Sequence, residues 1–170
     1  MRLEAQPAKI GRGNAVLHPQ HGIGKVQSVS EADFDGANGT KFARLFFKRE
    51  ALTLFLPLKD AAEAVRQPVN REQARQILDH VETCTPTTRK QWKARAAEHE
   101  EVLGRCDPFE CAEVFKGLQH LDAEGSLRHT DRAHLNQAMD FLADELSYAL
   151  GKSPDKVRQI ITRAAGEAKA

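Results

Sequence analysis

The spacing of apolar residues in this 170-residue chain changes near Pro68, and this change most limits what the chain can fold into. Before Pro68, short apolar runs are separated by Gly-rich turn sequences, and the leucines of LTLFLP alternate onto one face, as in a strand. After Pro68, apolar residues recur at steps of three and four, which is typical of amphipathic helices. We therefore predict an α+β chain, with a β module over residues 1–67 and an all-α helical module over residues 68–170.

The β module is expected to be a small β-barrel of the Tudor or SH3 kind, because four or five short strands fit into about fifty residues. VLHPQHGIGKVQSV predicts two strands around a turn, DGANG at Asp35–Gly39 predicts a turn, and KFARLFF and LTLFLPL predict two further strands. Pro57 fits a strand end. The strand Leu52–Leu56 is apolar on both faces, with Thr53 and Phe55 opposite the leucines. Since a small barrel buries only one face, Phe55 is expected to contact either the helical module or a partner protein.

The helical module is predicted to contain four or five helices, whose ends are marked by capping residues and glycines. Most of the start signals are a Ser, Thr, Asn or Asp before an apolar run, some of them supported by a Glu or Gln three residues later or by a first-turn proline. The predicted caps are Asn70 with Gln73, Thr88, Asp107 with Pro108 and Glu110, Thr130, and Ser153 with Pro154, and the predicted stops are Gly104 and Gly151.

Composition and motifs exclude several classes of function. The net charge of +1 gives no overall attraction to nucleic acid, so any such binding must come from a local patch. The three cysteines form no dense framework, and no stretch resembles a secretory signal or a membrane span, which is typical of a cytoplasmic protein. Cys106, Cys111, His129 and His134 come close to a zinc spacing but lack the usual tight pair of cysteines. No spacing supports a catalytic site, so we expect neither an enzyme nor a metal or cofactor.

The sole tryptophan, Trp92, lies in the sequence RKQWKARA among the cations Arg89, Lys90, Lys93 and Arg95. A helix that starts here carries positive charge at the end where the helix dipole disfavours it, by about 0.3–1 kcal/mol per group. The spacing supports two interpretations. In the first, Trp92 begins a core-facing stripe that continues with Ala96, His99 and Leu103. In the second, the exposed ring stacks on nucleic-acid bases while the cations bind phosphates.

The sequence resembles the CarD/CdnL family of bacterial transcription regulators. The matching pieces occur in order over roughly residues 12–165. They are VLHPQHGIG against a family pattern Val-Val-Tyr-Pro-x-His-Gly-Val-Gly, LTLFLP against a strand ending in Val-Pro, Val65–Arg66, the W-x-x-R of Trp92–Arg95, CAEVFKGL at Cys111–Leu118, and FLADELSYAL. The chain departs from the family at His18, where a Tyr is usual, and at Ala32 and Phe55, where some members carry arginines.

The resemblance implies a Tudor-like domain that docks on the β subunit of RNA polymerase by strand pairing, through Leu52, Thr53, Leu54, Phe55 and Leu56. It also implies that the helical domain contacts promoter DNA at the upstream edge of the transcription bubble. There Trp92 wedges into the minor groove, and Lys93, Arg95 and Arg132 join Arg89 and Lys90 as DNA-facing cations. Such a protein stabilises the open complex as a monomer without a small-molecule substrate. The alternative is a non-enzymatic adaptor between proteins, with Trp92 in the helical core.

Overall fold

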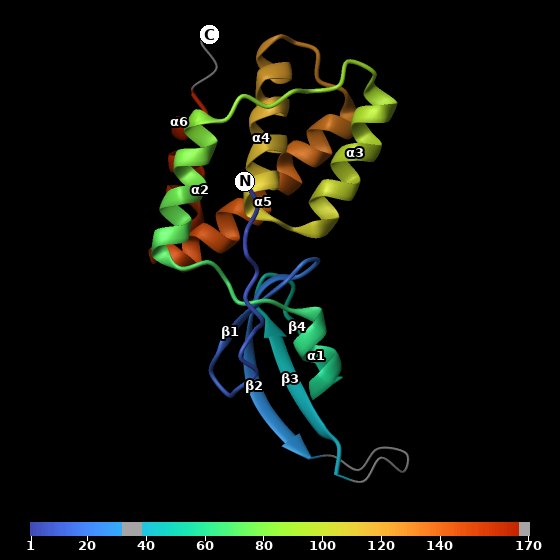
Figure 1. Cartoon of the computed structure of the whole chain (residues 1–170), viewed down its shortest axis with the longest axis vertical. Helices are drawn as coiled ribbons and strands as arrows, with labels where there is room; N and C mark the ends of the chain where they lie inside the picture. Colours follow the sequence, from blue (N-terminus) through green and yellow to red (C-terminus); the bar gives the residue numbers. More distant parts are fainter. Residues whose placement is uncertain (32–38, 167–170) are drawn as a thin grey trace. The chain divides into compact units, whose positions relative to one another are not determined.

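The structure is a computed structural model that describes residues 1–31 and 39–166. The chain folds into two compact units (Figure 1). Residues Glu4–Pro68 form the β unit, and Met1–Leu3 together with the chain from Val69 onward form the helical unit. Most of the turn predicted at Asp35–Gly39, and Ala32, lie outside the described residues.

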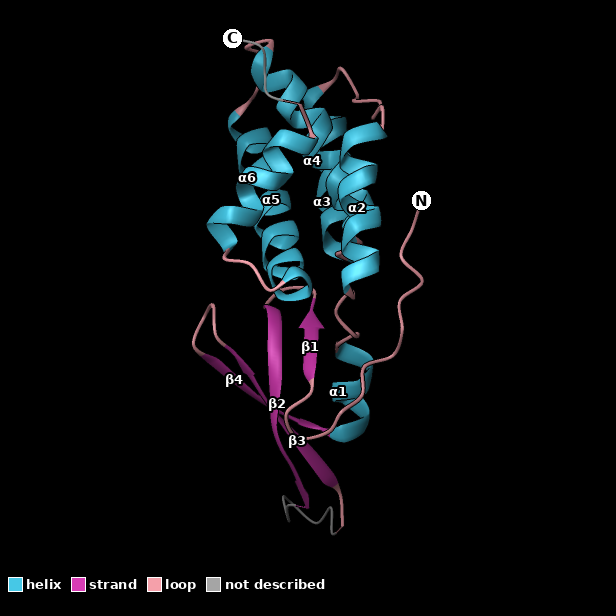
Figure 2. Ribbon diagram, turned by 90° about the vertical axis from the view of Figure 1, so that its left-hand side faces the viewer, coloured by secondary structure: helices cyan, strands magenta, loops and turns pink. Residues whose placement is uncertain are grey.

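The β unit is a four-stranded antiparallel sheet with the strand order β1-β2-β3-β4 (Figure 2). The strands are β1 (Ala15–His18), β2 (Gly22–Glu31), β3 (Lys41–Phe47) and β4 (Leu52–Pro57). One face of the sheet buries apolar side chains from the first three strands, which are Val16, Val26, Ala43, Leu45 and Phe47. A short helix, α1 (Leu58–Ala64), follows β4 directly and packs on this core through Ala61.

The α+β class is confirmed, but the described strands do not close into the predicted barrel. The strand order places β1 and β4 at opposite ends of the sheet, and no pairing joins them within residues 1–31 and 39–166. Instead, Leu17 of β1 exchanges two backbone hydrogen bonds with Arg66, of 2.9 and 3.0 Å. Helix α1 was not predicted from the sequence. After Pro57 the chain turns into this helix, which packs on the apolar inner face of the sheet.

The glycine-rich sequence HGIG is explained by a close approach across the sheet. Gly24 of β2 faces Phe47 of β3, and a Cβ atom on Gly24 would lie 2.5 Å from a carbon of the Phe47 ring. His18 and His21 pack against the same ring, with ring-centroid distances of 5.8 and 5.4 Å. The absence of a side chain at Gly24 therefore lets Phe47, the largest fully buried side chain among the described residues, sit against the sheet backbone.

The helical unit contains five described helices, and four or five were predicted. They are α2 (Arg71–Thr83), α3 (Trp92–Arg105), α4 (Pro108–Ala123), α5 (His129–Leu150) and α6 (Pro154–Ala164). Helix α4 is the most buried, because apolar residues occupy positions around most of its circumference. The core that surrounds it is formed largely by Ile77, Leu103, Phe109, Phe115, Leu118, Leu142, Leu146 and Ile161.

Most of the predicted helix ends are confirmed. Asn70 and Gln73 form the capping box of α2, Asp107 caps α4 ahead of Pro108, and Ser153 caps α6 ahead of Pro154. Gly151 ends α5 in the left-handed conformation, with φ of 63°. In these cases the signal is local, since the capping atom and the N–H group that it satisfies lie within three residues of each other.

Other predicted ends are wrong. Helix α3 begins at Trp92 after Gln91 rather than after Thr88, and it continues through Gly104 to Arg105. Helix α5 begins at His129, before Thr130. Glu110 accepts from Arg105 instead of completing a capping box, at 3.0 and 3.2 Å.

The first three residues belong to the helical unit. The Leu3 amide donates to Oδ2 of Asp107 at 2.8 Å, and Arg2 pairs with Glu110 at 3.0 Å. The residues that follow belong to the β unit. They run beside the last residues of that unit, where the Gln67 amide donates to the Gln6 carbonyl at 3.1 Å. The chain therefore passes between the two units twice.

No helix in the described part of the chain combines the length and the apolar character that spanning a membrane would require.

Candidate nucleic-acid interface

Trp92 is the first residue of α3, and its side chain is 40% exposed. The Nζ atom of Lys93 lies 5.7 Å from the centroid of its ring. The buried positions of α3 are Arg95, His99 and Leu103, whereas Trp92, at the start of the helix, is exposed. The interpretation that placed Trp92 in the helical core is therefore wrong, and the adaptor alternative loses the buried tryptophan on which it was built.

The N-terminus of α3 has neither a capping side chain nor an acidic residue in its first turn, and its N-cap residue is Gln91. Helices α2, α4 and α6 each have a side-chain oxygen that accepts from first-turn N–H groups. The first N–H groups of a helix carry a partial positive charge and suit an anion when no side chain satisfies them. The start of α3 thus combines N–H groups without a side-chain cap, cations and an exposed aromatic ring.

Arg95 was expected to face DNA, but the structure buries it. Only 3% of the residue is exposed, and its guanidinium donates to both carboxylate oxygens of Asp131, at 2.8 Å from Nε and 2.5 Å from Nη2. Its Nη1 atom donates to the carbonyls of Arg89 and Lys90, at 2.8 and 3.3 Å. The hydrogen bonds between Arg95 and Asp131 raise the pKa of Arg95 and lower the pKa of the Asp131 carboxyl. In this arrangement Arg95 has no surface to offer to a phosphate.

The other predicted cations are exposed. Arg89 pairs with Glu98 at 2.5 Å, and Arg132 of α5 pairs with Asp122 at 2.8 Å. All four of these side chains are more than two-fifths exposed, and exposed pairs of this kind contribute about 0–1 kcal/mol, so a phosphate can compete for each arginine. Because Arg95 of α3 bonds Asp131, the residue before Arg132, the first turns of α3 and α5 lie side by side. Arg132 directly follows the residue that makes this connection.

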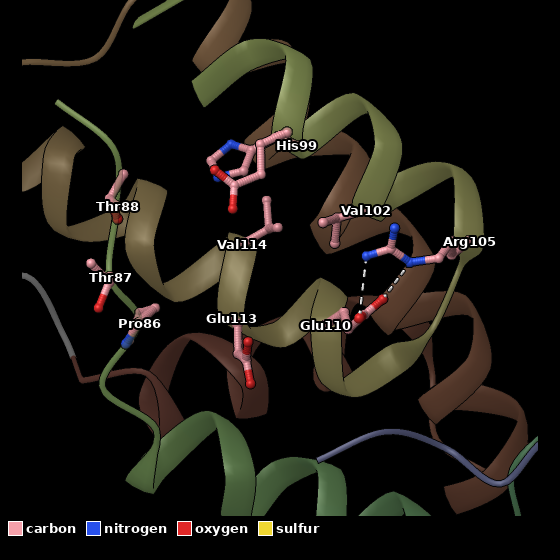
Figure 3. Close-up of a pocket in the computed structure, with 10 residues that line it drawn as sticks. Pro86, Thr87, Thr88, His99, Val102, Arg105, Glu110, Glu113 and Val114 are labelled. Carbon is pink, nitrogen blue, oxygen red and sulfur yellow. Dashed lines mark hydrogen bonds and ion pairs between the residues drawn. The ribbon is translucent and has the colours of Figure 1, made fainter. Parts of the chain in front are cut away.

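A cavity of about 250 Å³ lies on another side of α3, between that helix, α4 and the segment that precedes α3 (Figure 3). It is lined by Pro86, Thr87, Thr88, Glu98, His99, Val102, Arg105, Glu110, Glu113 and Val114. Glu110 is paired with Arg105, which lowers the pKa of the Glu110 carboxyl. Burial and the neighbouring His134 lower the pKa of His99. With three glutamates against one arginine, this lining repels phosphate and is distinct from the cationic start of α3.

The strand predicted to bind polymerase, Leu52–Leu56, is β4, the last strand in the sheet order. Its leucines are half-buried toward the core, whereas Thr53 and Phe55 lie on the opposite, exposed face. Phe55 is 43% exposed and stacks on Phe42 of β3, with ring centroids 5.0 Å apart and planes at 5°. The prediction that this strand is apolar on both faces is confirmed. The sequence analysis missed Phe42, although period-two alternation along KFARLFF places it on the same outer face.

Asp131 was also missed as part of this region. Its signal in the sequence is only that of an acidic residue in the first turn of a helix, where it accepts from the Arg128 amide at 3.0 Å. Among the described residues, no group of three or more His, Cys, Asp and Glu side chains is arranged to hold a metal ion, and the four side chains with near-zinc spacing are included in that statement.

Comparisons with known proteins place the helical part of the chain in a family. The family described as "CarD, C-terminal domain" matches residues 76–162, a stretch that runs from α2 to α6 and includes Trp92, Arg95, Asp131 and Arg132. The protein named "Putative transcription factor YdeB" from Bacillus subtilis (strain 168) is 21% identical over 147 residues. That alignment covers 86% of this chain and 95% of the Bacillus protein, so the similarity extends into the β unit.

Proposed function

This chain belongs to the CarD family, and from that premise we propose that it is a transcription regulator that stabilises the promoter open complex. In this proposal the helical unit contacts promoter DNA at the upstream fork of the bubble, where Trp92 wedges into the minor groove. The β unit binds the β subunit of RNA polymerase. The protein acts in the cytoplasm as a non-enzymatic monomer, without a cofactor.

The observation that carries the proposal is the exposed Trp92 at an uncapped helix start. An exposed tryptophan can stack on bases or enter between them where the duplex is already open. The uncapped N–H groups of α3 and the cations Arg89, Lys90, Lys93 and Arg132 are placed to hold the phosphates on either side. This offers a reason for a cationic cluster at the end of a helix where it is locally unfavourable.

The size of the effect follows from the stacking energy. An aromatic side chain stacked on a base contributes about 1–3 kcal/mol by truncation. Since each 1.4 kcal/mol is a factor of ten, a wedge of this strength would lengthen the life of the open complex by roughly five- to a hundredfold. Four cations alone would bind free DNA weakly at physiological salt.

The β unit is proposed to supply the missing affinity. A strand at the end of a sheet can pair with a strand of another protein, with main-chain hydrogen bonds giving the affinity. Strand β4 has that position, and the stacked rings of Phe42 and Phe55 add an exposed apolar surface beside it. Attachment to polymerase raises the effective concentration of the helical unit at the fork, so weak DNA contacts suffice. Phe55 stands at a position where some family members carry an arginine, so the side-chain part of this contact differs from theirs.

The first test is the lifetime of promoter open complexes with the cognate polymerase after challenge with a DNA competitor. Wild type is expected to lengthen the lifetime, and Trp92→Ala, shown by circular dichroism to be folded, is expected to lose that effect. Tyr148→Ala is the matched control, because Tyr148 is an exposed aromatic of the same unit, 53% exposed. It lies on α5 sixteen residues from Arg132, which is about 24 Å at 1.5 Å per residue.

Tyr148→Ala is expected to behave like wild type. A folded Trp92→Ala variant that lengthens the lifetime as much as wild type would remove Trp92 from the mechanism. No effect from wild type would remove the open complex as the target.

A further inference from the structure

We propose that Arg95 is the positioning residue for Trp92: its buried guanidinium fixes the segment before α3 and so sets where the indole leaves the helical unit. This inference rests on the function proposed above, in which Trp92 acts on DNA. It gives the Trp-x-x-Arg spacing a different explanation. The arginine is buried and positions the tryptophan, and it does not contact the nucleic acid.

The contacts of Arg95 join three parts of the helical unit. Its Nη1 atom holds the carbonyls of Arg89 and Lys90, the two residues before the N-cap of α3. Its Nε and Nη2 atoms hold the carboxylate of Asp131 in α5. Its own amide donates to the Gln91 carbonyl at 3.0 Å. These hydrogen bonds connect the segment before Trp92 to Arg95 of α3 and, through Arg95, to α5.

The start of α3 needs such a tie because nothing local defines it. Gln91 provides no cap, no acidic residue occupies the first turn, and the cations there oppose the helix dipole. A helix start of this kind frays, and a frayed start would let the Trp92 ring sample many positions. Arg95 holds the start of α3 by donating to carbonyls of the preceding segment, whereas α2, α4 and α6 each have a side-chain oxygen that accepts from first-turn N–H groups.

The shape of arginine suits this role. A guanidinium presents five N–H donors in a rigid plane, and Arg95 uses four donor–acceptor contacts in two directions. A lysine ammonium is a point charge on a flexible stem and cannot hold a carboxylate and two carbonyls in that geometry. Substitution of lysine at this position therefore keeps the charge but not the connection between the segments.

The Asp131 side chain extends the same connection to the start of α5. Its Oδ2 atom accepts from the Arg128 amide at 3.0 Å as well as from Arg95. The next residue along, Arg132, is exposed. One buried ion pair therefore fixes the positions of two exposed groups that the proposed function assigns to DNA, the indole of Trp92 and the guanidinium of Arg132.

The test uses the full chain and the single indole N–H signal that its one tryptophan gives in a nitrogen-15 NMR spectrum. The heteronuclear NOE of that signal reports the picosecond-to-nanosecond mobility of the Trp92 ring in the free protein. Two variants remove the connection. Arg95→Met with Asp131→Asn leaves no unpaired buried charge and keeps an oxygen for the Arg128 amide, and Arg95→Lys keeps the ion pair without the two carbonyl contacts. Arg105→Met is the control, since it removes a paired cation from the far end of α3.

Both variants are expected to fold, to lower the indole NOE in the free protein, and to reduce the open-complex lifetime to that of Trp92→Ala although Trp92 is present. Arg105→Met is expected to change neither. An unchanged indole NOE in a folded variant overturns the positioning role, and so does a mobile indole with a wild-type lifetime. If wild type itself fails to lengthen the lifetime, the proposed function fails, while the NOE comparison still decides whether Arg95 fixes Trp92.

Discussion

At the scale of single residues, the structure separates glycines that the fold requires from glycines that it tolerates. Gly24 lies against the Phe47 ring, where an added Cβ would be 2.5 Å from a ring carbon. Gly104 lies in α3 with nothing within 4 Å of an added Cβ. Both are single glycines in regular structure, so the sequence alone does not distinguish them.

We expect Gly24→Ala to lower the free energy of unfolding by about 1–3 kcal/mol, because overpacking displaces the Phe47 ring. Gly104→Ala is the matched control and should raise it by about 0.5–1 kcal/mol, since alanine suits a helix interior better than glycine. Urea unfolding of the two variants and of wild type measures both changes in the free energy of unfolding. Equal and small effects would contradict the assignment of Gly24 to a required close approach.

Arg95 shows why a residue's role is hard to predict from sequence. Its place in a run of cations predicted an exposed side chain, whereas helical spacing with His99 and Leu103 buries it. Its partner, Asp131, is 36 residues away, and no local pattern connects the two. The cations beside it were correctly predicted to be exposed, because a charged side chain in contact with water needs no partner residue.

At the scale of the elements, local signals predicted more than distant ones. The caps of α2, α4 and α6 follow from residues within one turn. The start of α3 was misplaced because Thr88 packs toward α4, where its Oγ1 would lie 2.7 Å from a Cβ on Gly117. The barrel was wrongly predicted because closure of a sheet depends on strand ends that lie far apart in the chain.

The uncapped start of α3 gives a prediction at this scale. Gln91→Asp should raise the free energy of unfolding by about 0.5–2 kcal/mol, because the new carboxylate caps the helix. It should also shorten the open-complex lifetime, because the same carboxylate occupies the N–H groups and repels phosphates. Asn70→Asp at the start of α2 is the control, since that helix is already capped, and it should change neither. A more stable Gln91 variant with a wild-type lifetime would exclude the α3 start from the DNA contact.

At the scale of the whole molecule, the two proposed roles fall on different units and can be separated by titration. Phe55→Glu places a charge on the exposed face of β4 and leaves the half-buried leucines in place. We expect it to weaken binding to polymerase, so that more protein is needed to lengthen the open-complex lifetime, with the same maximum at saturation. Trp92→Ala is expected to bind polymerase normally and to stay at the baseline lifetime at every concentration. A lowered maximum for Phe55→Glu would show that the β unit does more than attach the protein.

The two crossings between the units make the helical unit a discontinuous domain into which the β unit is inserted. The N-cap of α4 is completed by Leu3, a residue 104 positions earlier in the chain. A single exchange at Pro68 would separate Met1–Leu3 from the rest of their unit. A chimaera that takes only residues 69–170 from a relative keeps a foreign Arg2 and Leu3 against the new Asp107 position, so the first three residues must be transplanted with the helices.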